Sequence, residues 1–134
     1  MSGVIGVSGP YDFLPLRDPV LEAIFAPVGP RTQPISFAAN ARTPLLLLTG
    51  ADDRTVDPAN TARLAVRVCE TGGRADTVIY RGIGHVSAVG AFAVPLRFLA
   101  PVRDDVCHFL GLRPEAMASP AQQVNGTSEK VWAE

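Results

Sequence analysis

The sequence predicts an α/β fold in which about three parallel strands are flanked by helices. Two observations lead to this prediction: short apolar runs bounded by glycine or proline, and an amphipathic helix between two of those runs. The apolar runs are residues 4–8, 45–49 and 77–80. Strands that are apolar throughout, rather than alternating with polar residues, are typical of a parallel sheet that is buried on both faces.

The helix between the second and third runs is the clearest single element. Asp57 is a good N-cap residue, and Pro58 suits the first turn. Gly72 and Gly73 end the periodic pattern. The apolar stripe of this helix consists of Leu64, Ala65, Val68 and Cys69. Residues 44–81 are therefore predicted to form a strand, a helix and a second strand parallel to the first.

Composition and charge weigh against a nucleic-acid partner and against a membrane span. The 134 residues carry 12 Lys and Arg against 13 Asp and Glu, a net charge of -1, and the arginines are scattered. This balance gives no reason to expect a nucleic-acid partner. The most apolar stretch, residues 86–102, contains Arg97 and two prolines and is short for a membrane span, which needs ~20 apolar residues.

The first residues and the cysteines say little about location. The start lacks a basic segment and a cleavage pattern, so we expect no signal peptide; localisation stays unassigned, with the cytoplasm as the starting assumption. Two cysteines, Cys69 and Cys107, are too few for a disulfide framework, and we expect both to be buried free thiols.

Reactive side chains directly follow the second and third predicted strands. Asp53 lies in the loop Gly-Ala-Asp-Asp-Arg-Thr-Val of residues 50–56, and His85 ends the loop Gly-Ile-Gly-His of residues 82–85. Carboxyl ends of parallel strands meet at one sheet edge, and neighbouring strands lie ~5 Å apart, so we expect the two side chains to hydrogen-bond. Such a pair is the acid and histidine part of a nucleophilic triad. Asp52 is the alternative acid, and a core histidine is the alternative for His85.

These motifs, in this order, resemble the C-terminal part of an α/β-hydrolase. That fold places the nucleophile first, then the acid, then the histidine. Residues 6–13, Gly-Val-Ser-Gly-Pro-Tyr-Asp-Phe, are similar to the strand after the nucleophile in microbial carboxylesterases. The resemblance covers about residues 3–112. It implies that Asp53 and His85 are catalytic, that the substrate is a small-molecule ester, and that no cofactor is needed.

The chain contains no recognisable nucleophile. The motif Gly-x-Ser-x-Gly is absent from the 134 residues. Ser8 is a poor substitute because Pro10 replaces the second glycine, and Ser87 follows the histidine too closely. We therefore expect a C-terminal fragment of a serine carboxylic-ester hydrolase that is inactive alone. The alternatives are a non-catalytic binding or scaffold module, one half of a split hydrolase completed by a partner chain, and an enzyme that uses the acid and the histidine with a metal or water.

The resemblance also predicts the domain organisation. Residues 1–112 would form a partial α/β-hydrolase domain, and residues 113–134 a disordered tail. Within the domain, residues 10–43 would be a pocket wall or lid that contains a short helix after Asp18-Pro19, and residues 101–110 a further amphipathic helix. The predicted substrate-binding residues are Tyr11, Phe13, Leu14 and Phe25.

Two further expectations concern association and metals. The first strand would leave one edge unpaired, so we expect the isolated chain to self-associate there. His108 lies near Asp104 and Asp105 on its predicted helix, which permits a metal site, but a solvated helix face is the simpler interpretation.

Overall fold

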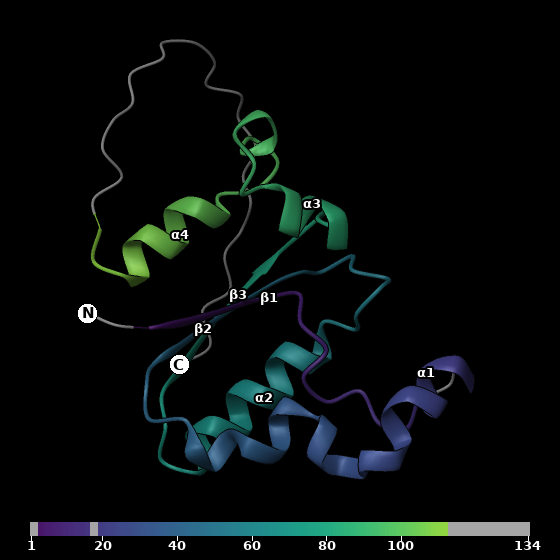
Figure 1. Cartoon of the computed structure of the whole chain (residues 1–134). Helices are drawn as coiled ribbons and strands as arrows, with labels where there is room; N and C mark the ends of the chain where they lie inside the picture. Colours follow the sequence, from purple (N-terminus) through teal and green to yellow (C-terminus); the bar gives the residue numbers. More distant parts are fainter. Residues whose placement is uncertain (1–2, 17–18, 113–134) are drawn as a thin grey trace, which may run out of the picture.

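A computed structural model describes residues 3–16 and 19–112 of the chain (Figure 1). Its centre is a sheet of three strands, β1 (Val4–Val7), β2 (Leu45–Gly50) and β3 (Ala75–Tyr80), in the order β1-β2-β3. Both pairings are parallel, with Val4 opposite Leu45 and Leu45 opposite Ala75. The predicted α/β class, the three parallel strands and the flanking helices are all confirmed.

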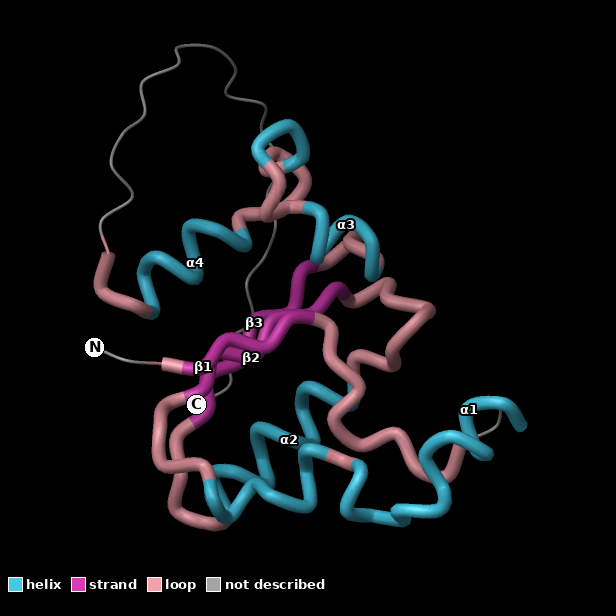
Figure 2. The backbone as a smooth tube through the Cα atoms, viewed as in Figure 1, coloured by secondary structure: helices cyan, strands magenta, loops and turns pink. Residues whose placement is uncertain are grey.

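Helices cover the two faces of the sheet unequally. On one face lie α2 (Ala59–Glu70) and two 3-10 segments, η1 (Ala26–Thr32) and η2 (Pro34–Asn40) (Figures 1 and 2). On the other face lie α3 (His85–Gly90) and α4 (Val102–Phe109), joined through the short segment η3 (Val94–Leu96). Helix α1 (Pro19–Phe25) lies at the periphery, beyond η1. The helices predicted after Asp18 and over residues 101–110 are thus present.

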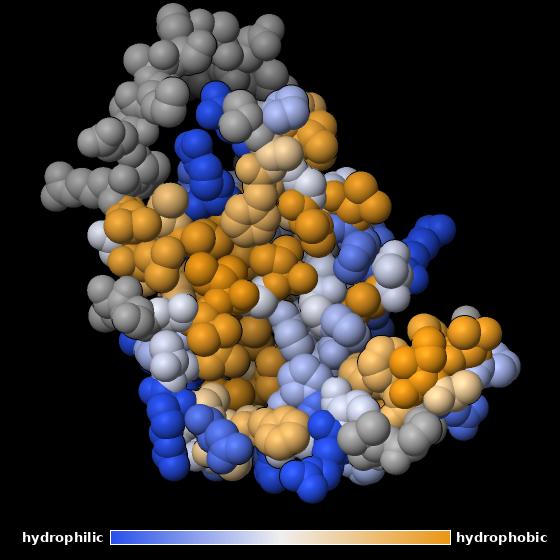
Figure 3. Space-filling model, in the orientation of Figure 1, coloured by the Kyte–Doolittle hydropathy of each residue, from blue (hydrophilic) through white to orange (hydrophobic). Residues whose placement is uncertain are grey.

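Strand β1 has an open outer edge in the part of the chain that the structure describes. Val4 N–H donates to Pro44 O at 3.0 Å and Ser8 N–H donates to Leu48 O at 2.8 Å. Since alternate residues of a parallel strand face the same neighbour, the N–H groups of Ile5 and Val7 point to the open side. Hydrophobic residues gather over β1 and α4 on the molecular face that Figure 3 shows.

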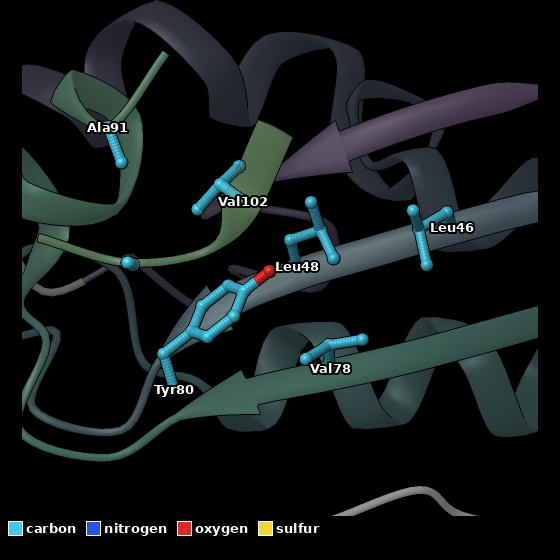
Figure 4. Packing of buried hydrophobic residues seen from close by; sticks show 7 residues of the cluster. Leu46, Leu48, Val78, Tyr80, Ala91 and Val102 are labelled. Carbon is cyan, nitrogen blue, oxygen red and sulfur yellow. The ribbon is translucent and has the colours of Figure 1, made fainter. Parts of the chain in front are cut away.

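The core consists of two hydrophobic clusters that β2 separates. Leu46 and Leu48 pack on the α3–α4 face, and Leu47 packs on the α2 face. Successive side chains of a strand point to opposite faces, which explains why β2 is apolar without interruption. The first cluster is completed by Val78, Tyr80, Ala91, Ala100 and Val102 (Figure 4), and the second by Ala38, Leu64, Ala65 and Val68.

Helix α2 begins and ends close to the predicted residues. Its first residue is Ala59, so the N-cap position falls on Pro58, one residue later than predicted. Asp57 still serves as a cap, because its carboxylate accepts the Ala59 N–H at 2.9 Å. After the helix, Gly72 adopts a φ of +83°, a conformation that favours glycine.

The prediction of two buried thiols was wrong. Cys69 is exposed, and Cys107 is partly exposed. Cys69 comes five residues after the buried Leu64, which places it roughly 140° around the helix and off the apolar face. Other expectations fall outside the described residues: Asp18 and the tail of residues 113–134. None of the described helices is long and apolar enough to cross a membrane.

Candidate active site

The loops that carry Asp53 and His85 are held together by backbone hydrogen bonds. Ala51 N–H donates to Tyr80 O at 2.8 Å, and Asp52 N–H donates to Ile83 O at 3.0 Å. Gly50 makes this approach possible, because a Cβ at that position would collide with the carbonyl oxygen of Ile83. The relative position of the two loops is therefore fixed by the backbone.

The Asp53 carboxylate is fully enclosed by hydrogen-bond donors. Its side chain is 0% exposed. One oxygen, Oδ1, accepts the N–H groups of Thr55 at 2.9 Å and Val56 at 2.8 Å, and the other, Oδ2, lies 2.8 Å from His85 Nδ1. Burial by itself would raise the pKa of Asp53. The hydrogen bonds from Val56, His85 and Thr55, together with the nearby Ser8 hydroxyl, outweigh burial, so the pKa is lowered.

His85 is the first residue of α3 and its ring is partly open to solvent. Its side chain is 28% exposed. Because Asp53 accepts the proton on Nδ1, the neutral ring leaves Nε2 free to accept a proton. Nε2 makes no hydrogen bond within the described residues. The hydrogen bond that the sequence predicted between the acid and the histidine is thus present, with the basic nitrogen available.

The two glycines of the Gly-Ile-Gly-His loop differ in role. Gly82 has a φ of +71°, a conformation that favours glycine. Gly84 has a φ of -95° and a ψ of -179°, extended backbone that any residue adopts, and a Cβ there would meet only Asp52 O at 3.6 Å. The sharp turn before His85 therefore depends on Gly82 and not on both glycines.

The alternative acid, Asp52, does not meet the histidine. It is exposed, and its contact with the histidine loop runs through its backbone N–H. Asp53 and Asp52 are adjacent, so the sequence could not separate them by position alone. The structure brings Asp53, and not Asp52, to His85.

A cavity of about 860 Å³ borders the acid loop. Phe13, Leu14 and Phe25 line it, and Phe13 and Phe25 meet edge to face with ring centroids 5.5 Å apart. Residues 54–57, which directly follow Asp53, form part of the opposite wall. Three of the four predicted substrate-binding residues therefore share one cavity next to the acid loop.

Tyr11 is the predicted substrate-binding residue that the structure does not bring to this cavity. Its ring packs against Gly6 and Gly9 and joins the cluster on the α2 face of the sheet, where it lines a different cavity of about 470 Å³. Both glycines lack a side chain, so the ring folds back onto the strand. Burial raises the pKa of Tyr11, and the Gly9 backbone partly offsets this.

His108 and Ser8 are two further residues that the sequence singled out. His108 and the neighbouring aspartates form no group of three metal-ligating side chains within the described part of the chain. Ser8, considered in the sequence only as a weak nucleophile candidate, lies at the end of β1 beside Asp53. No signal in the sequence indicated that its hydroxyl would reach the acid.

A sheet of three parallel strands with helices on both faces is consistent with part of an α/β-hydrolase. The profile of the prolyl oligopeptidase family, an α/β-hydrolase family, matches residues 29–98, more than half of the chain. The chain belongs to the prolyl oligopeptidase family, and hence to a serine hydrolase family. No curated protein matches the chain. The family match supports the superfamily predicted from the motifs, but not the carboxylesterase-like resemblance in particular.

Proposed function

We propose that the chain supplies the catalytic acid, Asp53, and the catalytic histidine, His85, of a serine hydrolase that acts on small carboxylic esters. The serine nucleophile and its oxyanion hole come from polypeptide outside these 134 residues, which contain no Gly-x-Ser-x-Gly. The observation that carries the proposal is the 2.8 Å contact between His85 Nδ1 and a carboxylate that is otherwise held by two backbone N–H groups.

The chemistry follows from that contact. His85 Nε2 removes the proton of the incoming serine as its oxygen attacks the substrate carbonyl carbon. The imidazolium that forms is stabilised by Asp53, whose lowered pKa keeps it ionised near neutral pH. The proton then passes to the departing alcohol as the C–O bond breaks, and a second cycle with water releases the acid.

Residues 10–43 form the wall of the substrate pocket in this proposal. The cavity joins an apolar wall, with Phe13 and Phe25, to the residues that follow Asp53. Sites for small organic ligands commonly combine apolar walls with placed polar groups, and here the polar part of the lining includes Asp12, Arg54 and Arg63. An acyl chain or an apolar side chain of the substrate would occupy it.

A peptide substrate is the second candidate, and the family match favours it. The matched family is named for an oligopeptidase. Esters and amides pass through the same acyl-serine intermediate, so the acid and histidine do not distinguish them. Comparing hydrolysis of p-nitrophenyl esters with that of matched p-nitroanilides decides between the two candidates.

The open edge of β1 is the surface through which we propose that the missing part joins the sheet. Ile5 and Val7 direct backbone N–H groups outward, and Val4 is 52% exposed. In the isolated chain this edge would pair with a second copy instead. Sedimentation of the wild type should show oligomers that Val4→Lys reduces, because a charge on an edge strand opposes pairing. A monodisperse wild-type monomer would contradict this part.

The test of function is complementation. The chain alone should not hydrolyse p-nitrophenyl acetate. Co-expression with a polypeptide that carries Gly-x-Ser-x-Gly and is encoded beside it should give hydrolysis, which Asp53→Asn lowers about 10⁴-fold by favouring the wrong histidine tautomer. Asp52→Asn is the matched control and should keep most activity.

Two outcomes would contradict the proposal. Turnover by the chain alone that is lost on His85→Ala would show that the nucleophile lies within the 134 residues. Binding of the co-expressed polypeptide without hydrolysis of either ester or anilide would favour a non-catalytic module.

A further inference from the structure

Ser8 combines three unusual features at the end of β1. Its φ is +47°, and no other described non-glycine residue has a positive φ. The residue is only 2% exposed. Its hydroxyl oxygen is buried and makes no hydrogen bond among the described residues. Each feature costs free energy, so their coincidence at one residue requires an explanation.

The left-handed backbone of Ser8 occurs where the β1–β2 pairing ends. Ser8 N–H donates to Leu48 O at 2.8 Å, which continues the β1–β2 pairing by one residue before the chain turns at Gly9 and Pro10. Glycine adopts such a φ without strain, whereas serine does so at a cost. A serine at a position suited to glycine indicates that its side chain is used.

The position of the hydroxyl indicates its use. Ser8, Asp53 and His85 lie just beyond the ends of β1, β2 and β3, three adjacent parallel strands. The Ser8 hydroxyl reaches the Asp53 carboxylate and contributes to its lowered pKa. A buried hydroxyl beside a buried carboxylate has one low-energy arrangement, in which its hydrogen points at the carboxylate.

We propose that Ser8 is a positioning residue, whose hydroxyl donates a hydrogen bond to the Asp53 carboxylate and helps to hold it in place for His85. The inference rests on the proposed function of Asp53 and His85 and assigns the acid a further donor from the neighbouring strand. Asp53 would then receive hydrogen bonds from its own loop, from the histidine after β3 and from the serine after β1.

The same geometry argues against Ser8 as the nucleophile. A triad serine contacts the histidine nitrogen opposite the one that meets the acid. Ser8 instead meets the acid, while His85 Nδ1 already contacts Asp53. The serine that His85 Nε2 would activate must approach from elsewhere.

The test separates the hydroxyl of Ser8 from its backbone strain. Ser8→Ala removes the hydroxyl and keeps the strain, and Ser8→Gly removes both. Thr49→Val is the matched control. The Thr49 hydroxyl is also buried without a partner among the described residues, and Thr49 follows Leu48, the register partner of Val7. Thr49 is not among the groups that shift the pKa of Asp53. Titration of the Asp53 carboxyl carbon by NMR in the isolated chain reads the effect directly.

The expected result is a rise in the pKa of Asp53 in both Ser8 variants and no change in Thr49→Val. Because glycine relieves the backbone strain, Ser8→Gly should melt at a higher temperature than Ser8→Ala. If the role of Ser8 were only structural, the pKa of Asp53 in Ser8→Gly would equal that of the wild type. In the complemented hydrolase, both Ser8 variants should lower kcat/KM about tenfold, the size expected for one hydrogen bond to a charged group.

An unchanged Asp53 titration in Ser8→Gly would overturn the proposal even if Ser8→Ala fails to fold. The two proposals fail separately. An unchanged titration together with an active complemented enzyme removes only the role of Ser8. A shifted titration without hydrolysis of any ester or anilide by the complemented chain removes only the hydrolase function.

Discussion

The βαβ unit of residues 45–80 and helix α1, which lies within the connection of residues 10–43, both border the candidate site, but they differ in how firmly they are packed. Leu46, Leu47, Leu48 and Val78 in the βαβ unit are at most 2% exposed. Helix α1 in the connection has no buried residue, and its Val20 is 67% exposed. The first region carries the acid and leads to the histidine, whereas the second forms part of the cavity lining.

Specific polar contacts hold the first part of the connection, one to α2 and one within the connection itself. Asp12 N–H donates to Asn60 Oδ1 at 2.7 Å, and Leu14 N–H donates to the side chain of Gln33 at 2.8 Å. The difference between the regions suggests a division of labour. The sheet fixes the relative position of Asp53 and His85, while the exposed helix α1 contributes Leu21 and Phe25 to the lining of the neighbouring cavity.

The largest predicted loss of stability compares one substitution in each of the two regions. Leu48→Ala removes a side chain that is 0% exposed, between the strands and α3–α4, and should destabilise the chain by about 2–5 kcal/mol. The matched change Leu21→Ala, at a leucine of α1 that is 42% exposed, should cost less than about 1 kcal/mol. Denaturant unfolding of both variants measures the two values. Equal losses would show that α1 is part of the core.

The next effect concerns the two glycines beside the site. Gly50→Ala places a methyl group against the Ile83 carbonyl oxygen and should cost about 1–3 kcal/mol while separating the acid and histidine loops. Gly84→Ala meets only an ordinary contact at 3.6 Å and should leave stability nearly unchanged. Thermal unfolding of the two variants provides the comparison. A tolerated alanine at position 50 would mean that the loops are not held in close approach.

The pH dependence of stability tests the acid itself. The pKa of Asp53 is lower in the folded chain than the ordinary value of 3.8, so the unfolded chain binds its proton first as pH falls. The stability that the carboxylate contributes is therefore complete above about pH 5 and is lost as pH falls below about 4. Denaturant midpoints of wild type and Asp53→Asn should converge at low pH. A constant difference across this range would contradict the lowered pKa.

The smallest effect should appear in substrate choice. Phe13→Ala removes one of the two rings that meet at the cavity wall, and its effect on unfolding should stay within about 1 kcal/mol because the ring is only half-buried. In the complemented hydrolase it should lower kcat/KM for a longer acyl chain more than for acetate, by about tenfold for each 1.4 kcal/mol of lost contact. An equal change for both chain lengths would place the acyl group elsewhere.

Local patterns in the sequence predicted the parts of the molecule that depend on local physics. The apolar runs gave the strands, and the loops after β2 and β3 gave the contact between Asp53 and His85, because parallel strands end at one edge. The packing of Tyr11 onto Gly6 and Gly9 was not predicted, since it depends on how the chain folds back after β1. The apolar stripe predicted for α2 wrongly included Cys69, which is exposed. The apolar character of a residue does not by itself place it on the buried face of a helix.

Ser8 illustrates the remaining limit. Its residue type and neighbours were visible in the sequence. Its positive φ and its place beside Asp53 depend on the pairing of β1 with β2, in which Val7 lies opposite Leu48, 41 residues further along the chain. Tertiary arrangement, rather than composition, decides whether a serine at a strand end attacks a substrate or supports an acid.

Complementation with a nucleophile-bearing polypeptide tests the central claim most directly. The account predicts that p-nitrophenyl acetate is hydrolysed when the chain is combined with a polypeptide containing Gly-x-Ser-x-Gly, that the chain alone is inactive, and that His85→Ala abolishes the combined activity. Hydrolysis by the combination that survives His85→Ala would contradict the claim that this chain supplies the catalytic histidine.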